Sequence, residues 1–253
     1  MGVRRRFFVE RFEGNAAVMG GEAAHHLGRV LRAEAGQLYE LSDGKAAWLG
    51  RIESVARERI EFALVEELPT PRSAADVSLL LSIVKFDAFE WALEKATELG
   101  VARIVPLAAA RSEKSLISGA AKRSERWRKI LLESSQQSRR LSVPGLAPVG
   151  KPLERFAEHK NDFCVLLCER ADAPSMRSVL EKARDSGGAI RAINGPARPV
   201  AVAIGPEGGW TDEELASGRV SGFREASLGQ LILRTETAVV AAISIVNYAL
   251  STE

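Results

Sequence analysis

A change of pattern near residue 70 constrains the fold of this chain more than any other feature. Before the proline-bounded segment Pro69–Ser73, short runs of alternating polar and apolar residues are separated by turn signals. After it, apolar runs alternate with stretches in which apolar residues recur at helical spacing. The first pattern is typical of a small β-barrel, and the second predicts a mainly parallel sheet with helices on both faces. We therefore predict an α/β protein of two domains, residues 1–70 and 74–253.

The first domain contains one strong hairpin signal. Gln37–Leu41 alternates in polarity and runs into Ser42-Asp43-Gly44-Lys45, and Asp-Gly is a preferred pair for a tight hairpin turn. Further strands are predicted over Ala46–Gly50, Arg51–Val55 and Arg59–Val65, with one helix around Glu22–Leu31.

The second domain alternates strands and helices. We expect strands over Val77–Val84, Arg103–Leu107, Asp162–Glu169, Val200–Ile204 and Arg224–Leu228. Asp87, with Glu90 three residues later, has the spacing of a capping box and predicts a helix that ends at Gly100. A long helix is expected over Lys122–Arg140.

Composition favours a cytoplasmic protein without a structural metal. No apolar run reaches the roughly 20 residues that a membrane-spanning helix needs. Cys164 and Cys168 would lie on one face of a strand, about 13 Å apart, which is too far for a disulfide. Two cysteines and three scattered histidines do not form a recognisable zinc site.

A glycine-rich loop follows the predicted strand Val200–Ile204. The run Gly205-Pro206-Glu207-Gly208-Gly209 leads into a helix that Thr211 and Glu214 would cap. Loops at the carboxyl ends of parallel strands bind ligands in α/β proteins, and glycines let the backbone approach a ligand closely. The loop lacks the Lys-Ser/Thr pair of a phosphate-binding loop, so a neutral or cationic ligand suits it better. A simple turn between strand and helix is the alternative.

A second loop, Leu228–Ala238, leads into a helix that is apolar on all sides. Eleven of the thirteen residues from Ala238 to Leu250 are apolar, so the sheet would cover one side and a partner subunit the other. Arg234 and Glu236 at its start are expensive to desolvate unless they are functional, or unless they pair with each other or cap the helix.

Basic residues cluster between Arg111 and Lys151, where ten lysines and arginines stand against three acids. Such a segment suits contact with nucleic-acid phosphates, although a solvated helix face has the same composition. Trp127 within it is expected to pack in the core. Together with the first domain, the predicted RNA-binding residues are Arg4, Arg5, Arg6, His26, Arg29, Arg32, Arg111, Lys114, Arg139 and Arg140.

Several motifs follow one another in the order of a known family. They are the Gly-Pro-Glu-Gly-Gly loop, Leu228–Ala238 with its Ile-Leu-Arg-Thr-Glu-Thr-Ala run, Glu90–Val101, Gln136–Arg139, and His26-Leu27 with Val30–Arg32. Across nearly the whole chain they resemble the RsmE family of bacterial 16S rRNA methyltransferases, which belong to the SPOUT superfamily and act on the N3 atom of uracil. The chain departs from the family at Leu231, where a basic residue is usual, and at Trp210, where Phe is frequent.

The resemblance implies an N-terminal PUA-like RNA-binding barrel and a C-terminal SPOUT-type domain with a deep trefoil knot. It also implies a homodimer through the C-terminal domain, a role in ribosome biogenesis, and S-adenosylmethionine bound in the knot. Mapped onto this sequence, the cofactor-binding residues would be Leu167, Cys168, Glu169, Ile204, Gly205, Pro206, Glu207, Gly208, Gly209, Leu228, Gly229, Ile232, Leu233, Arg234, Thr237 and Ala238.

The chemistry requires removal of a proton, because the uracil ring nitrogen is protonated. We expect Arg234 and a basic-segment arginine (Arg111, Arg139 or Arg140) to hold the anionic ring, with Glu236 or Glu207 as the base. Two alternatives remain open at this point: methylation of a ribose 2'-hydroxyl or another base, in tRNA or rRNA, and a non-catalytic RNA-binding module.

Overall fold

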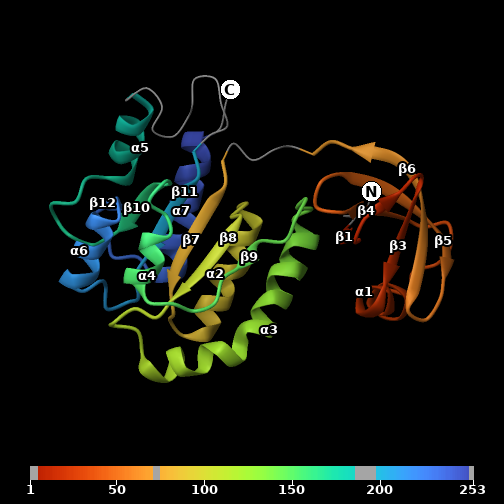
Figure 1. Ribbon diagram of the computed structural model, residues 1–253, viewed down its shortest axis with the longest axis horizontal. Coiled ribbons are helices and arrows are strands. Elements are labelled where there is room, and N and C mark those ends of the chain that lie inside the picture. The colour runs from red at the N-terminus through yellow and green to blue at the C-terminus, as the bar shows by residue number, and fades with distance from the viewer. Residues whose placement is uncertain (1–4, 71–74, 186–197, 251–253) are drawn as a thin grey trace. The chain divides into compact units, whose positions relative to one another are not determined.

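The computed structural model describes residues 5–70, 75–185 and 198–250. The chain divides into two compact units (Figure 1). Unit 1 comprises Met1–Arg72 together with Leu132–Val143, and unit 2 comprises Ser73–Leu131 together with Pro144–Glu253. No pattern in the sequence marks the segment Leu132–Val143 as part of unit 1.

Unit 1 is built on a six-stranded sheet. Its strands are β1 (Arg6–Phe8), β2 (Phe12–Glu13), β3 (Ala16–Gly20), β4 (Leu38–Ser42), β5 (Ala47–Val55) and β6 (Arg59–Leu68). They lie in the order β1-β4-β5-β6-β3-β2, with β1 parallel to β4 and the other pairs antiparallel. Alternate residues such as Ile52, Ile60 and Phe62 point into the core, as the period of two requires.

The hairpin at Asp43-Gly44 forms as predicted. The Asp43 carboxylate accepts hydrogen bonds from the backbone N–H groups of Lys45 and Ala46, and Gly44 has a positive φ of 85°. The two strands predicted over 46–55 are instead one strand, β5, with a shift of register between Leu49 and Gly50. The predicted helix begins as α1 (Gly21–His25) and continues as a π-helical turn over His26–Val30.

Unit 2 contains the predicted parallel sheet. Its strands are β7 (Val77–Ser82), β8 (Arg103–Leu107), β9 (Gly145–Leu146), β10 (Phe163–Leu167), β11 (Val200–Ile204) and β12 (Arg224–Ala226). They lie in the order β12-β10-β11-β7-β8-β9, and every neighbouring pair is parallel. The carboxyl ends of β10, β11 and β12 therefore meet at one edge of the sheet.

The helices of unit 2 pack in two groups against this sheet (Figure 1). They are α2 (Phe86–Glu98), α4 (Pro152–Ala157), α5 (Met176–Asp185), α6 (Asp212–Val220) and α7 (Thr235–Leu250). Helix α3 (Lys114–Gln137) begins in unit 2, and its last residues, from Leu132, belong to unit 1. Helix α7 packs against β11, α2 and α5, whereas α4 packs against α6 and β8. Phe156 of α4 and Leu215 of α6 share a core with alternate residues of β10 and β11.

Two helix predictions were wrong. Helix α2 begins at Phe86, with Lys85 at its N-cap and no side-chain cap, so Asp87 lies inside the first turn. Glu90 is buried and pairs with Arg123 and Arg126 of α3 rather than completing a capping box. Helix α3 begins at Lys114, eight residues before the predicted start.

Among the described residues, helix α7 is buried on one side only. Val239, Ala242, Ile243 and Val246 are buried, whereas the Tyr248 side chain is 84% exposed. Trp127, by contrast, lies in the core as expected, where its ring contacts Phe86 and Phe89. Within the described ranges, no helix is both long and apolar enough to cross a membrane.

Candidate functional site

A cavity of about 460 Å³ lies at the carboxyl ends of β10, β11 and β12. Its size is in the range of sites for small molecules and cofactors, and its place at strand ends is where α/β sheets bind ligands. The wall is formed by the three loops that follow β10, β11 and β12, by the connection between β8 and α3, and by residues of the helices α6 and α7. The wall residues are Arg111, Leu167–Arg170, Ile204–Trp210, Leu215, Ser227–Thr235 and Ala238. Loops distant in sequence are thus brought together by the parallel sheet.

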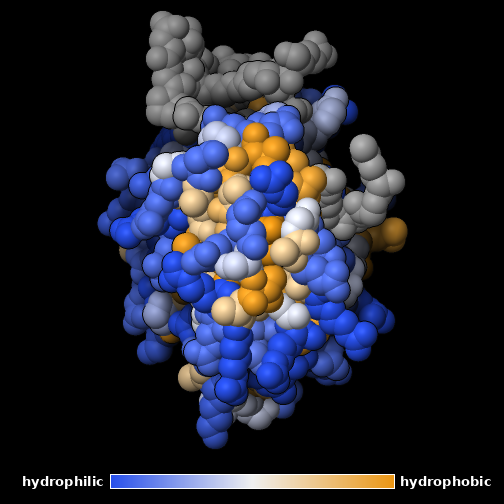
Figure 2. All heavy atoms as spheres, turned by 90° about the vertical axis from the view of Figure 1, so that its right-hand side faces the viewer, coloured by the Kyte–Doolittle hydropathy of each residue, from blue (hydrophilic) through white to orange (hydrophobic). Residues whose placement is uncertain are grey.

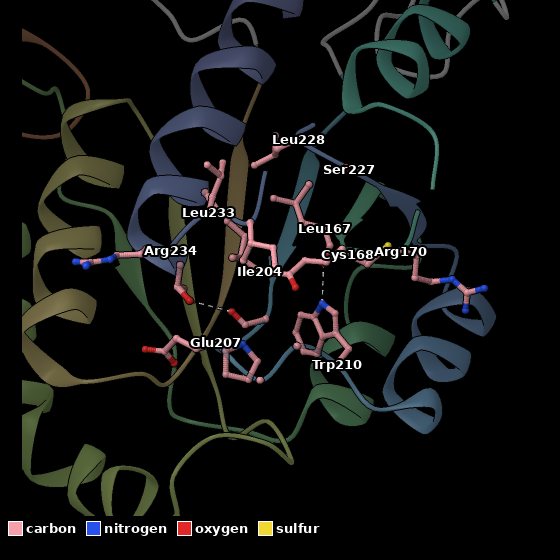
Figure 3. A pocket seen from close by; sticks show the side chains of 18 of the residues that line it. Leu167, Cys168, Arg170, Ile204, Glu207, Trp210, Ser227, Leu228, Leu233 and Arg234 are labelled. Carbon is pink, nitrogen blue, oxygen red and sulfur yellow. Dashed lines mark hydrogen bonds between the residues drawn. The ribbon is translucent and has the colours of Figure 1, made fainter. Parts of the chain in front are cut away.

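The Trp210 side chain joins the first two loops. Its indole Nε1–H donates a hydrogen bond to the Leu167 carbonyl oxygen at 2.9 Å, and its ring lies against Gly205 (Figure 3). A Cβ at Gly205 would stand 3.1 Å from the ring, so a larger residue there would crowd the tryptophan that reaches Leu167. Gly209 has a positive φ of 68°, a conformation that side-chain-bearing residues avoid.

Thr235 joins the third loop to the second. Its hydroxyl donates to the Gly205 carbonyl oxygen at 3.3 Å, at the first residue of α7 (Figure 3). Within the third loop, Ser227 Oγ accepts from the Gly229 N–H and donates to the Gly229 carbonyl. The three loops are therefore linked by side-chain hydrogen bonds to backbone groups, which leaves the wall of the cavity preorganised.

The predicted capping box at the start of α6 is confirmed. Thr211 Oγ1 accepts from the Glu214 N–H, and the Glu214 carboxylate accepts from the Thr211 N–H. The same carboxylate accepts from the Ala110 N–H at 2.8 Å, and Arg111 Nη1 donates to the Gly208 carbonyl at 2.8 Å. The segment after β8 is thereby attached to the glycine loop at two points.

Charged side chains stand on both sides of the cavity. Figure 3 shows Arg234 and Glu207 on one side and Arg170 on the other. Arg170 faces Glu225, with 3.8 Å between Nε and Oε2, and Arg219 also pairs with Glu225. Arg234 and Glu207 are exposed and stand where a second substrate could reach them.

The two cysteines are free thiols in different surroundings. Burial raises the pKa of the Cys164 thiol to about 12, with Asp162 acting in the same direction. Burial also raises the pKa of Cys168, which lies in the wall of the cavity. Neither thiol is therefore an activated nucleophile.

The cavity gathers most of the residues predicted to bind the cofactor. Of the sixteen predicted positions, fifteen line it, and the exception is Thr237, whose side chain is exposed on α7. Among the three candidate catalytic residues, Arg234 and Glu207 line the cavity, whereas Glu236 does not. Trp210 and Thr235 were not predicted as site residues. Trp210 directly follows the glycine-rich loop Gly205–Gly209, and Thr235 directly follows Arg234.

The predicted RNA-binding residues fall in varied surroundings. Arg5, His26, Arg29, Arg32, Arg111 and Lys114 are exposed. Arg6 is buried and forms an ion pair with Glu40 at 3.0 Å, and Arg139 approaches the other oxygen of Glu40 at 3.4 Å. Arg140 is half-buried, and burial lowers its pKa. Arg4 lies outside the described residues.

The Glu40 cluster explains why these arginines occur where they do. A carboxylate that is 10% exposed on β4 requires cationic partners, and Arg6 of β1 supplies one of them. Arg139, whose backbone has a positive φ of 56°, supplies the second cationic partner. Nearby, the Leu141 carbonyl accepts a hydrogen bond from the Ser42 hydroxyl at 2.7 Å. These contacts hold the segment Leu132–Val143 within unit 1.

Unit 1 also exposes apolar side chains. Figure 2 shows one face of the molecule, on which apolar residues are gathered among hydrophilic ones. The large exposed apolar residues of unit 1 are Val30, Leu31, Val55, Val65 and Leu132. Val30 and Leu31 lie beside Arg29 and Arg32 in sequence, so apolar and cationic groups occur together there.

Among the described residues, no three His, Cys, Asp or Glu side chains are arranged to hold a metal ion.

Comparisons with known proteins agree on one family. A family model described as an RNA methyltransferase domain matches residues 71–247. The ribosomal RNA small subunit methyltransferase E of Synechocystis sp. is 32% identical over 233 residues, which cover 88% of this chain and 70% of that protein. The protein of the same name from Bacillus subtilis is 29% identical over 259 residues, covering 96% of each.

A solved structure has the same fold. The ribosomal RNA small subunit methyltransferase E from Neisseria gonorrhoeae, bound to S-adenosyl methionine, superimposes with a TM-score of 0.81 and 28% identity. The match covers 97% of both chains.

Proposed function

The chain belongs to the RNA methyltransferase family, and we propose that it transfers a methyl group from S-adenosylmethionine to the N3 atom of a uridine in 16S rRNA of the small ribosomal subunit. The observation that carries this proposal is the cavity at the carboxyl ends of β10, β11 and β12, where hydrogen bonds join three loops. Two relatives named as small-subunit ribosomal RNA methyltransferases support the substrate, and a similar structure bound to S-adenosyl methionine supports the cofactor.

The walls of the cavity suit S-adenosylmethionine. Leu167, Ile204, Leu228 and Leu233 give an apolar surface for a planar adenine ring. Gly208 and Gly209 line the cavity and place no side chain in it. The cofactor supplies a methyl group already activated by its sulfonium, so the protein's part is to orient the two reactants.

The residues at the open side of the cavity suit the acceptor base. Arg234 and Arg111 would stabilise the negative charge that develops on the ring when the N3 proton leaves. Glu207 would accept that proton, because it lines the cavity on the same side as Arg234 whereas Glu236 does not line it. The target base would have to be unpaired or turned out of a helix to reach this site.

Unit 1 would bind the surrounding RNA as a PUA-like barrel. Exposed Arg29 and Arg32, next to exposed Val30 and Leu31, combine phosphate-binding and base-contacting groups. Arg6 and Arg139 would serve by holding the fold of unit 1 through Glu40.

The assembly would be a cytoplasmic homodimer through unit 2, and the backbone of unit 2 would form a deep trefoil knot around the cofactor. The exposed side of α7 with Tyr248, and the exposed Leu231 and Ile232 at the cavity, support a partner subunit that covers apolar surface.

A methyl-transfer assay with three RNA substrates tests the proposal. Purified protein with labelled S-adenosylmethionine is expected to label assembled small subunits from a strain that lacks this gene, and to leave tRNA unlabelled. Small subunits from the parent strain provide the control, since their site is already methylated. Labelling of tRNA instead would redirect the proposal to another RNA, and failure to bind the cofactor by calorimetry would overturn it.

A further inference from the structure

Glu214 is a buried carboxylate outside the cavity wall whose bonds exceed the needs of a helix cap. Glu214 is 3% exposed and belongs to the first turn of α6. One oxygen accepts from the Thr211 N–H at 2.9 Å and from the Thr211 hydroxyl at 3.1 Å. The other accepts from the Ala110 N–H at 2.8 Å, across 104 residues of sequence. Only the first set belongs to a capping box.

The hydrogen bond between Glu214 and the Ala110 N–H holds the backbone directly before Arg111. Arg111 extends from this segment over the glycine loop, where its Nη1 donates to the Gly208 carbonyl. Its stem lies against the glycine, because a Cβ at Gly208 would stand 3.2 Å from the Arg111 Cβ. Glu214 thus holds the backbone at Ala110, directly before Arg111, and the Gly208 carbonyl holds the Arg111 guanidinium.

We propose that Glu214 is a positioning residue, which sets where the Arg111 guanidinium stands at the rim of the cavity. This inference rests on the proposed function, in which Arg111 stabilises the anionic target base. The Arg111 Nη1 donates a hydrogen bond to the Gly208 carbonyl. This hydrogen bond determines where the remaining N–H groups of the planar guanidinium point. Glu214 acts through Arg111 and makes no contact with the cofactor or the target base.

A carboxylate is required at this position because all three partners are donors. The N-terminus of α6 also favours a negative charge. A glutamine keeps the size of the side chain but presents its amide N–H group to one of the donors. Glu214→Gln therefore removes at least one hydrogen bond, and the segment Ala108–Ser112 loses part of its attachment.

The test compares Glu214→Gln with Glu213→Gln, its exposed neighbour in the same helical turn. Both variants remove one negative charge from the start of α6, but only the first touches Ala110. We expect Glu214→Gln to lower kcat for methyl transfer to small subunits about tenfold, the size of effect of one charge-assisted hydrogen bond. Glu213→Gln should retain wild-type kcat, and calorimetry should show cofactor affinity within about threefold of wild type for both.

A double-mutant cycle separates positioning from a general structural effect. If Glu214 acts through Arg111, the double variant Glu214→Gln/Arg111→Ala will be no slower than Arg111→Ala alone. Additive losses in kcat would overturn the inference while leaving the methyltransferase assignment intact.

Hydrogen–deuterium exchange gives a readout that does not depend on activity. Glu214→Gln should accelerate exchange in peptides covering 108–116, and Glu213→Gln should not. Unchanged exchange there would contradict the role of Glu214 even if no RNA substrate is methylated, so the two proposals fail separately.

Discussion

At the scale of single residues, the site depends on a few side chains that bond to backbone groups of distant loops. Trp210 shows this most clearly, because its indole N–H satisfies the Leu167 carbonyl where the cavity wall begins. Phe would fill the same space but leave that carbonyl without its donor. The pattern of glycines predicted a ligand loop, but it could not reveal which carbonyl a tryptophan 43 residues away would reach.

Trp210→Phe is therefore expected to destabilise the protein by about 1–3 kcal/mol, the cost of leaving a buried carbonyl unsatisfied. The cofactor affinity should fall as well, because Leu167 lines the cavity. Denaturant unfolding and calorimetry measure the two effects. Trp91→Phe, at a 44% exposed tryptophan, is the control and should change neither.

The two candidate bases differ in position and so should differ in effect. Glu207→Gln is expected to lower single-turnover methyl transfer about a hundredfold or more, as is typical for loss of a general base. Glu236→Gln should stay near wild type, because Glu236 does not line the cavity. The opposite ranking, with both variants folded by circular dichroism, would assign the proton to Glu236.

The cysteine pKa values predict the pH dependence of thiol labelling. A raised pKa means that less thiolate is present at a given pH, so labelling by iodoacetamide should be slow at pH 7 and increase as the pH rises. Cys164, with a pKa of about 12, should stay unlabelled at pH 9, whereas Cys168 should react and be protected by S-adenosylmethionine. Mass spectrometry of the labelled peptides decides this, and equal labelling of both thiols would contradict it.

At the scale of helices and strands, apolar runs proved the most informative signal. The ends of β8 and β11 agree with the prediction because all their residues except Arg103 are apolar and buried within the sheet. The start of α3 was missed because Lys114–Ala121 contains two serines and a glycine, which favour a helix less than most residues do. The prediction of a capping box at Asp87 was wrong because Glu90 pairs with arginines of another helix. The spacing of neighbouring residues in the sequence cannot show such a contact.

Helix α7 offers a test of packing at this scale. Ile243 is fully buried on α7, which packs against β11 and α2, whereas its neighbour Ser244 is exposed. Ile243→Ala should lower the free energy of unfolding by about 2–5 kcal/mol, and Ser244→Ala by less than about 0.5 kcal/mol. Urea unfolding of both variants measures the difference, and equal effects would show that α7 contributes little to the core.

At the scale of the whole molecule, topology explains why the site could be predicted from sequence. Carboxyl ends of parallel strands meet at one edge, so loops after Leu167, Ile204 and Ala226 had to converge. The return of Leu132–Val143 to unit 1 was not predictable, because it depends on Glu40 meeting arginines from residues 6 and 139. Such long-range ion pairs leave no periodic trace in a sequence.

The most direct test of the whole account is to identify the methylated nucleoside. Small subunits from a strain lacking this gene are incubated with the protein and isotopically labelled S-adenosylmethionine, and the 16S rRNA is then digested to nucleosides for mass spectrometry. The account predicts labelled 3-methyluridine and no other labelled nucleoside. Label in a 2'-O-methylated nucleoside, or in another methylated base, would contradict the assignment of the uridine N3 atom.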